Sequence, residues 1–373
     1  PMPRVASTSP PISNRALNRA TLARQGLLER QAAGPVEMLR HLIGLQGQVP
    51  NAPYVALWSR LARFRPADLE ALLVEREAVR ATLMRATVHV ALAEDFFAIR
   101  PLIQPIVARV LRSNHLKPLK GADPEEVAAA GRQELDAEAL VPAELGRRLQ
   151  ARWPDIGAID LSMPVRLLEP LVHVPPAGLF GRAGAPALTT ARRWLGEKDV
   201  APIDPEALAL RYLKAFGPAS GADFNAWSGL GGGAALFERL RPRLVTFATE
   251  DGREVFDLPE APRPDEATPA PVRLLPDYDN VILGYAERGR ILSPEAWKGL
   301  WRSNGLRPAF LIDGVVRGNW KLTLGKGTAR ADLFWFDSLS RREAAALRHE
   351  AERLLADLAP GRDAAVTLGA FAE

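Results

Sequence analysis

Two neutral carboxamides flank a glycine in the segment Leu45-Gln46-Gly47-Gln48, directly after a stretch of helical periodicity over Val36–Leu45. Each glutamine side chain offers a carbonyl acceptor and an NH₂ donor, and neither group titrates at physiological pH. Because Gly47 has no Cβ, a backbone, a sugar or a phosphate can approach it closely. Such a pair can hold and orient a water molecule but cannot take its proton. It therefore suits a reaction whose leaving group is already activated.

The same segment has a simpler interpretation. Gly47 is a candidate helix cap and Pro50 a candidate helix stop, so the glutamines could merely follow the end of a helix. Side chains at positions i and i+2 share a face only where the chain is extended or irregular. The catalytic interpretation therefore requires Gln46 and Gln48 to face one groove or pocket.

Composition limits the classes of protein that are possible. The chain has 373 residues, enough for two or three domains, and no apolar stretch long enough to cross a membrane. It has no cysteine, and its five histidines are scattered without metal-ligand spacing, so we predict neither a metal nor a cofactor. The lack of cysteine fits a reducing cytoplasm, and the arginine-rich composition is typical of a high-GC bacterium. The sequence pI of about 9.6 permits nucleic-acid binding without requiring it.

The elements that must position the glutamines follow a repeating order of two or three short helices and then a β-hairpin. The third repeat is clearest, with a helix over Pro205–Phe216, a cap at Ser220 and a hairpin turn at Asp251-Gly252. This order is typical of a winged helix, a module that places one helix in the major groove. We predict an α+β fold of tandem winged-helix modules with a C-terminal α+β region, together forming a concave DNA-binding surface. The predicted boundaries are a flexible tail at 1–14, modules at 15–115, 116–200 and 201–260, a linker at 261–271 and the C-terminal region at 272–373.

The C-terminal region is predicted to consist mainly of strands. Its one long helix is predicted over Arg341–Leu358, and Asp313-Gly314 is predicted to close a hairpin. The predicted strands are Val272–Leu275, Asn280–Leu283, Ala309–Ile312, Val315–Trp320, Ala329–Phe336 and Ala364–Leu368.

The chain resembles the bacterial winged-helix DNA glycosylases of the AlkZ type over nearly its whole length past Asn14. The resemblance is carried by residues 17–28 (LNRATLARQGLL), the Leu-Gln-Gly-Gln motif, the strand pair at 80–92, Ala215–Ala219 and residues 274–280 (LLPDYDN). Relatives that act on simpler substrates have Asp at the second polar position of the motif, where this chain has Gln48. The resemblance thus implies the branch that removes bulky adducts and interstrand crosslinks, often as antibiotic self-resistance.

The chemistry of alkylated purines agrees with that implication. Alkylation at N7 makes the base cationic, so the glycosidic bond is already weak and the departing base needs little acid assistance. Gln46 and Gln48 are expected to hold the attacking water by their carbonyls and to place partial negative charge near the sugar. The resemblance implies a monofunctional hydrolase that needs no cofactor and acts on double-stranded DNA in the bacterial nucleoid. No heptad or exposed apolar stripe argues against a monomer, which is the predicted state, although the sequence leaves the oligomeric state open.

The predicted DNA contacts are basic, polar and aromatic side chains on the expected modules and on the hairpin Phe310–Leu322, whose groups suit a minor groove or an unstacked base step. They are Arg24, Gln25, Arg85, His89, Arg192, Arg193, Arg317, Asn319, Trp320 and Lys321. For each arginine the alternative is a solvated surface charge, for Trp320 a core position, and for His89 a satisfied strand position. Asp277 and Asp279 are expected either to stabilise charge in a site or to cap a turn.

Two other functions remain open at this point. A non-catalytic winged-helix DNA-binding protein, such as a regulator or a sequestering factor, would use the same fold. An inactive relative that binds only a free drug would also carry the same motifs.

Overall fold

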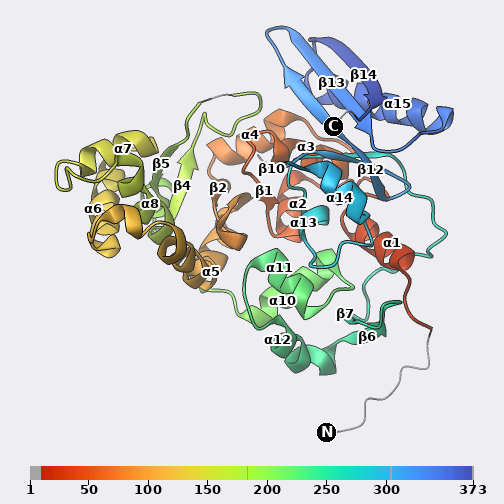
Figure 1. The fold of residues 1–373 in the computed structure, drawn as a ribbon, viewed down its shortest axis with the longest axis horizontal. Coiled ribbons are helices and arrows are strands. Elements are labelled where there is room, and N and C mark those ends of the chain that lie inside the picture. The colour runs from red at the N-terminus through yellow and green to blue at the C-terminus, as the bar shows by residue number, and fades with distance from the viewer. Residues whose placement is uncertain (1–9, 183, 303–304, 372–373) are drawn as a thin grey trace.

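The structure is a computed structural model, and it describes residues 10–182, 184–302 and 305–371. Helices and small sheets alternate along the chain, which confirms the predicted α+β class (Figure 1). Most of the predicted tail at 1–14 lies outside the described residues. Within them, Ser13 caps the first helix, α1 (Asn14–Arg24), by accepting a hydrogen bond from the Ala16 amide at 3.0 Å.

One order of elements occurs three times: a helix, a short strand or bridge, two helices and a hairpin. In the first unit the elements are α2 (Pro35–Leu42), β1 (Leu45–Gln46), α3 (Ala52–Arg60), α4 (Pro66–Val74), β2 (Ala78–Thr82) and β3 (Val88–Leu92). In the second they are α6 (Pro124–Ala137), α7 (Pro142–Leu149), α8 (Ala158–Leu168), β4 (Leu171–Val174) and β5 (Ala187–Thr190). In the third they are α10 (Pro205–Phe216), α11 (Gly221–Ser228), α12 (Gly233–Leu240), β6 (Val245–Ala248) and β7 (Glu254–Asp257). We interpret the repeated order as that of a winged helix.

The short first strand also recurs in each unit. In the first unit β1 pairs with β3, and in the other two a single bridge takes its place, Leu140 with Leu188 and Ala219 with Phe256. Each bridge joins the segment before the second helix to the last strand of the hairpin. The glutamine motif thus occupies a position that all three units fix by backbone hydrogen bonds.

The first two units are joined more closely than predicted. Strand β2 pairs with β4 through Arg80–His173 and Ala81–Val172, so their hairpins form one five-stranded sheet of order β1-β3-β2-β4-β5. The helix α5 (Ala93–Asn114) links the two units, and α9 (Ala191–Leu195) follows the sheet. In Figure 1 the helices α6, α7 and α8 lie at one end of the long axis, with the first unit nearer the centre.

The C-terminal region forms a second five-stranded sheet of order β14-β13-β12-β11-β8, in which only β13 and β14 run parallel. Its strands are β8 (Arg273–Leu275), β11 (Ala309–Ile312), β12 (Val315–Leu324), β13 (Thr328–Trp335) and β14 (Asp363–Ala370). The long helix α15 (Arg341–Leu358) makes the crossover between β13 and β14, while α14 (Pro294–Leu300) precedes the short pair β9 (Trp301–Arg302) and β10 (Gly305–Leu306).

One predicted strand of this region is wrong. Asn280–Leu283 forms the short helix α13, because the Asp279 carboxylate accepts a hydrogen bond from the Val281 amide at 2.9 Å and so caps a helical turn. A short apolar run does not distinguish a strand from a buried helix by pattern alone.

The largest hydrophobic core runs through the first and third units and the C-terminal sheet, whereas the second unit has a core of its own around Leu135, Leu161 and Val165. Among the helices of the described ranges, none combines the length and the apolar character that crossing a bilayer requires.

Candidate active site

The glutamine motif lies on extended backbone and not at a helix cap. Helix α2 ends at Leu42, where Ile43 (φ 59°) and Gly44 (φ 91°) turn the chain out of the helix. Gly47 then follows strand β1 and donates its amide to the Val88 carbonyl at 2.8 Å. A Cβ at Gly47 would stand 3.3 Å from the backbone of His89 and Val90, so glycine permits this close approach. The interpretation of Gly47 as a helix cap is therefore wrong.

The two glutamine side chains differ in exposure. Gln48 is exposed, and its Oε1 accepts only a long hydrogen bond from the Val88 amide at 3.4 Å. Gln46 is 6% exposed, and its Oε1 accepts hydrogen bonds from Arg85 Nη2 at 2.9 Å and from Thr87 Oγ1 at 3.3 Å. Gln48 is thus open to a ligand, whereas Gln46 is held by its neighbours.

The orientation of the Gln46 amide follows from chemistry, because a guanidinium only donates hydrogen bonds and the group facing Arg85 must be the carbonyl. Two donors occupy that oxygen. The Gln46 Nε2 makes no hydrogen bond within the described part of the chain. It is also not fully buried, because it does not belong to the sealed side-chain atoms that lack a partner there, so a small part of it is accessible to solvent. The expectation that both carbonyls hold the water is corrected here: Gln48 presents an acceptor and Gln46 presents a donor.

Arg85 connects the motif to the third unit. The residue adopts a left-handed conformation (φ 56°), and its Nη1 donates to the Trp227 carbonyl at the end of α11. A Cβ on Gly229 would meet the Arg85 Cα at 3.0 Å, so the approach of the two segments depends on a glycine there. Burial lowers the pKa of Arg85 to about 10, which leaves the guanidinium charged at neutral pH. Arg85 is partly exposed and holds Gln46, so we assign it as a positioning residue, and its predicted contact with DNA stays a prediction.

Arg80 holds the backbone of the motif from the other side, a role that the sequence analysis missed. From strand β2 its Nε donates to the Gly47 carbonyl at 2.9 Å, and its Nη2 lies 3.5 Å from the Gln48 carbonyl. Its Nη1 donates to His173 Nδ1 at 2.9 Å, so this ring nitrogen is an acceptor. Only the pairing of β2 with β4 brings His173 here, and no local pattern could have indicated that.

Two histidines near the motif are kept neutral by burial. His89 is 1% exposed, and burial, assisted by the charge of Arg85, lowers its pKa to about 3. Burial and the charge of Arg80 likewise lower the pKa of His173 to about 3. His89 Nδ1 bonds to the Thr87 carbonyl at 2.9 Å, so the prediction that this ring points toward DNA is wrong.

We expect these histidines to make the protein sensitive to acid. In the unfolded chain a histidine titrates near pH ~6.5, so between there and pH ~3 the unfolded state binds protons that the native state does not. The free energy of unfolding should therefore fall with pH in that window, by about 1.4 kcal/mol per unit for each histidine. Denaturant titrations at pH 7.5 and 5 should show a smaller fall for His89→Gln than for the wild type. The exposed His349→Gln is the control, and an equal fall in all three proteins would contradict the assignment.

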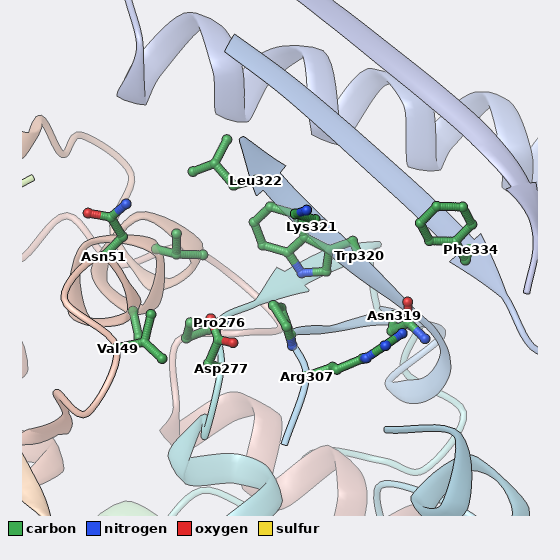
Figure 2. A pocket seen from close by; sticks show the side chains of 13 residues that line it. Val49, Asn51, Pro276, Asp277, Arg307, Asn319, Trp320, Lys321, Leu322 and Phe334 are labelled. Atoms are coloured by element: carbon green, nitrogen blue, oxygen red, sulfur yellow. The ribbon is translucent and has the colours of Figure 1, made fainter. Parts of the chain in front are cut away.

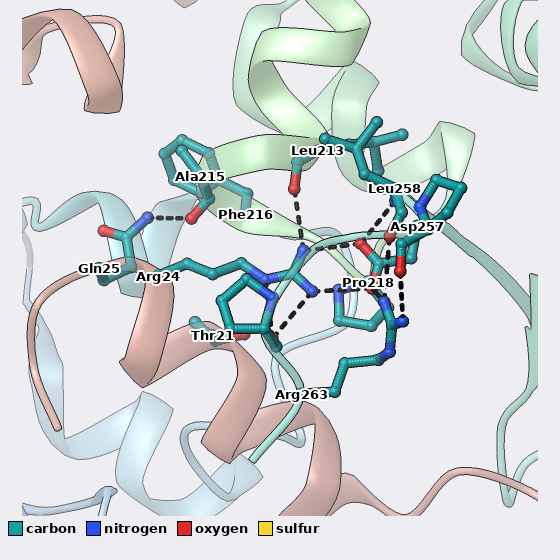
Figure 3. Close-up of polar contacts among 12 residues, drawn as sticks. Thr21, Arg24, Gln25, Leu213, Ala215, Phe216, Pro218, Asp257, Leu258 and Arg263 are labelled. Carbon is teal, nitrogen blue, oxygen red and sulfur yellow. Dashed lines mark hydrogen bonds and ion pairs between the residues drawn. The ribbon is translucent and has the colours of Figure 1, made fainter. Parts of the chain in front are cut away.

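Arg24 and Gln25 are buried and therefore do not form a DNA-contacting surface. Figure 3 shows their polar contacts. Arg24 makes a two-pronged ion pair with Asp257, with both N–O distances at 2.7 Å, and both side chains are sealed from solvent. Gln25 donates to the Ala215 carbonyl at 2.7 Å. The two residues tie α1 to α10 and β7, and their prediction as DNA contacts is corrected accordingly.

Four further predicted contacts lie at or near the surface. Arg192 and Arg193 are exposed beside β5, and Arg192 pairs with Asp136 at 3.2 Å. On β12, Arg317 is partly exposed and bonds to Asp337 at 2.9 Å, whereas Lys321 is exposed. These four remain candidate DNA contacts.

The other two residues of the hairpin are buried. Trp320 donates its Nε1 to the Leu275 carbonyl at 2.8 Å, which confirms the alternative of a core position. Asn319 is 2% exposed, and its Nδ2 has no hydrogen-bond partner among the described residues. Both line a cavity, together with Asp277 and Arg307 (Figure 2).

The two aspartates of the 274–280 segment have separate roles. Asp279 caps α13 and forms a fully buried ion pair with Arg60, with N–O distances of 2.7 and 2.9 Å. Asp277 faces the cavity, and burial raises its pKa to about 6. Within the described ranges, no three His, Asp or Glu side chains gather as a metal site would require.

Comparison with known proteins places the chain in a family. The family model described as "DNA glycosylase AlkZ-like" matches residues 39–356, so the chain belongs to the AlkZ-like family of DNA glycosylases. Its fold is similar to that of the Streptomyces sahachiroi DNA glycosylase AlkZ, with a TM-score of 0.77 and 21% sequence identity, covering 96% of this chain and 100% of that chain. No curated protein sequence matches the chain. The family confirms the predicted class, a DNA glycosylase of DNA repair.

Proposed function

We propose that the protein is a monofunctional hydrolase that releases N7-alkylated purines from double-stranded DNA, including bulky adducts. The observation that carries the proposal is the exposed Gln48 carboxamide, two residues from a Gln46 whose Nε2 is left without a hydrogen-bond partner among the described residues, on backbone held by Arg80. Both groups are uncharged, and the nearby His89 is buried and neutral.

The reaction needs no strong base when the purine is already alkylated at N7. As the bond between C1′ and N9 breaks, its electron pair moves into the cationic purine, which departs as a neutral base. Water adds to the oxocarbenium-like C1′ and releases its proton to solvent, leaving an abasic site. Catalysis then consists of placing the water and stabilising the developing charge.

Gln48 fits the role of water holder. Its Oε1 has one long bond, to the Val88 amide at 3.4 Å, and so retains capacity to accept a hydrogen bond from water. The carbonyl also places the negative end of a dipole toward the sugar, where positive charge develops.

Gln46 fits a different role. Because its carbonyl is occupied by Arg85 and Thr87, the group it offers is an N–H donor. A donor suits a phosphate or sugar oxygen of the nucleotide and would disfavour an oxocarbenium ion. We therefore assign Gln46 to orientation of the substrate.

Relatives with simpler substrates have aspartate at the position of Gln48. The glutamine of this chain therefore supports a substrate range that includes bulky adducts and the unhooking of interstrand crosslinks. An amide cannot activate water as a carboxylate does, so the substrate must have a labile bond. The proposal therefore includes a role in antibiotic self-resistance alongside general repair of alkylation damage.

The test is release of free base from a duplex that contains one N7-methylguanine. After incubation, chromatography should detect 7-methylguanine, and alkali should cleave the strand at the resulting abasic site. Retarded mobility of the duplex without base release would instead support a non-catalytic DNA-binding protein. Strand cleavage before alkali would contradict the monofunctional assignment.

A further inference from the structure

Three basic side chains gather where the first two units meet, and within the described ranges none of them pairs with an acidic side chain. Arg80 comes from β2, His173 from β4, and Arg166 from the last turn of α8, seven residues before His173. Arg80 and His173 are cross-strand partners, so their side chains lie on the same face of the sheet. We call these three residues the basic cluster.

The hydrogen bonds of His173 fix which ring nitrogen carries the proton. Arg80 Nη1 donates to Nδ1 at 2.9 Å, so in the neutral ring the proton is on Nε2. Burial, together with the charges of Arg80 and Arg166, lowers the pKa of His173 to about 3, which keeps the ring neutral at physiological pH. The residue is partly exposed, and its Nε2 is not one of the sealed unpaired atoms in the described part of the chain. Nε2–H is therefore a donor that a ligand can reach.

Arg166 is a half-buried cation without a counter-charge. Among the described residues its one polar contact runs from Nη1 to Met163 Sδ at 3.3 Å, and a thioether is a weak acceptor. Burial lowers the pKa of Arg166, and no acidic side chain in the described part of the chain opposes that effect. The end of α8 offers it only the partial negative charge of the helix dipole. Because a buried charge is costly unless it is paired, the free nitrogens of this guanidinium suit an anion.

The basic cluster is joined directly to the glutamine motif. The guanidinium of Arg80 that donates to His173 also donates through Nε to the Gly47 carbonyl at 2.9 Å, and its Nη2 lies 3.5 Å from the Gln48 carbonyl. His173 is thus one side chain away from the backbone of the proposed water holder. Arg80 itself is 7% exposed, so a ligand would meet the two partly exposed members of the cluster.

A DNA phosphodiester matches this arrangement. It carries one negative charge, and its two unesterified oxygens only accept hydrogen bonds. The cluster offers N–H donors from a guanidinium and an imidazole, and charge-assisted hydrogen bonds of this kind are the strong ones. Phosphate contacts also fix the register of a protein on a duplex, which is what a water held at a single residue requires.

We propose that Arg166 and the Nε2–H of His173 bind a phosphate that flanks the lesion on the damaged strand, and that Arg80 links this phosphate site to the backbone of Gln48. The inference rests on the proposed function for the position of the lesion, whereas DNA as the ligand follows from the family. Because every duplex carries this phosphate, loss of the site should weaken the binding of damaged and undamaged DNA alike.

The first experiment measures the affinity of the full chain for an undamaged duplex by fluorescence anisotropy between about 50 and 200 mM salt. Each phosphate contact contributes about 0.9 to the slope of log K against log salt. Arg166→Gln should lower affinity by about tenfold and reduce that slope by about one, whereas Arg166→Lys keeps the charge and should keep the slope. Arg152→Gln is the matched control, because Arg152 is an exposed arginine of the same unit that already pairs with Glu126 at 2.8 Å. An unchanged slope for Arg166→Gln would overturn the proposal, even if its affinity fell.

A second variant guards against misfolding. His173→Asp gives Arg80 and Arg166 the carboxylate that they lack, so its melting temperature should not fall below that of the wild type. The same carboxylate would repel a phosphate, and DNA affinity should fall by about 10²-fold. A structural role for His173 would not combine retained stability with lost affinity. Binding of His173→Asp at wild-type strength would show that the phosphate does not lie here.

The position of the contacted phosphate is tested with duplexes that contain N7-methylguanine and a neutral methylphosphonate at one of the phosphates flanking it. One of these substitutions should weaken binding by the wild type by about tenfold and cause no further loss in Arg166→Gln. Equal losses in the two proteins at every position would place Arg166 away from the lesion and refute the assignment. If the wild type releases no 7-methylguanine, the proposed function fails, while the salt slope still tests the phosphate contact.

Discussion

Replacing Gln48 with alanine should slow release of 7-methylguanine by about 10²–10³-fold, the usual cost of removing a preorganised polar group that acts on the transition state. The side chain is exposed and its carbonyl makes one long bond, so its loss should leave the fold intact. Single-turnover kinetics with excess enzyme would measure the chemical step, and fluorescence anisotropy with an intact duplex would measure affinity. Affinity should stay within about twofold of wild type.

Variants of Gln46 and Gln48 distinguish the roles of the two side-chain amides. Gln46→Glu keeps an oxygen acceptor for Arg85 and Thr87 but loses the N–H donor, so we expect weaker DNA binding together with slower release. Gln48→Glu keeps the acceptor and should retain more activity than Gln48→Ala. The double variant Gln46→Ala/Gln48→Ala should abolish release. Unchanged release by the double variant would refute the catalytic assignment of the motif.

The sequence indicated the elements best where caps and turns specify them locally. The prediction for α10 matches its observed bounds, because Asp204 caps the helix at Pro205 and Gly217-Pro218 ends it. Ser220 caps α11 through the Asp223 amide at 3.2 Å, as predicted. These signals lie within a few residues of the structure that they determine, so one segment is enough to interpret them.

The candidate DNA contacts were predicted less well, because burial depends on partners far away in the sequence. An arginine near the end of a helix, such as Arg24, is usually exposed. Here it is buried because it pairs with Asp257, which lies 233 residues further along the chain. His89 alternates with valines, yet pairing with Gln46 on β1 covers it. Asp277 and Asn319 come together only when β8 and β12 join one sheet, so no spacing in the sequence could have indicated their cavity.

The buried ion pair of Arg60 and Asp279 has a structural importance that the sequence did not reveal. It joins the end of α3, the helix that follows the glutamine motif, to the cap of α13, and both side chains are sealed from solvent. Arg60 also donates to Gln25 Oε1 at 3.2 Å. The pair therefore links three segments that are distant in the chain.

Arg60→Met should lower the free energy of unfolding by about 3–5 kcal/mol, because it leaves the Asp279 carboxylate buried without a counter-charge. Thermal melts and urea titrations would measure the loss. Adding Asp279→Asn should recover much of it, since asparagine is neutral and can still accept the Val281 amide bond that caps α13. The exposed pair Arg40–Glu94 provides the control, and Arg40→Met should cost no more than about 1 kcal/mol. Equal losses for Arg60→Met and Arg40→Met would show that solvent reaches Asp279, and the junction between α3 and α13 would then be held by packing rather than by charge.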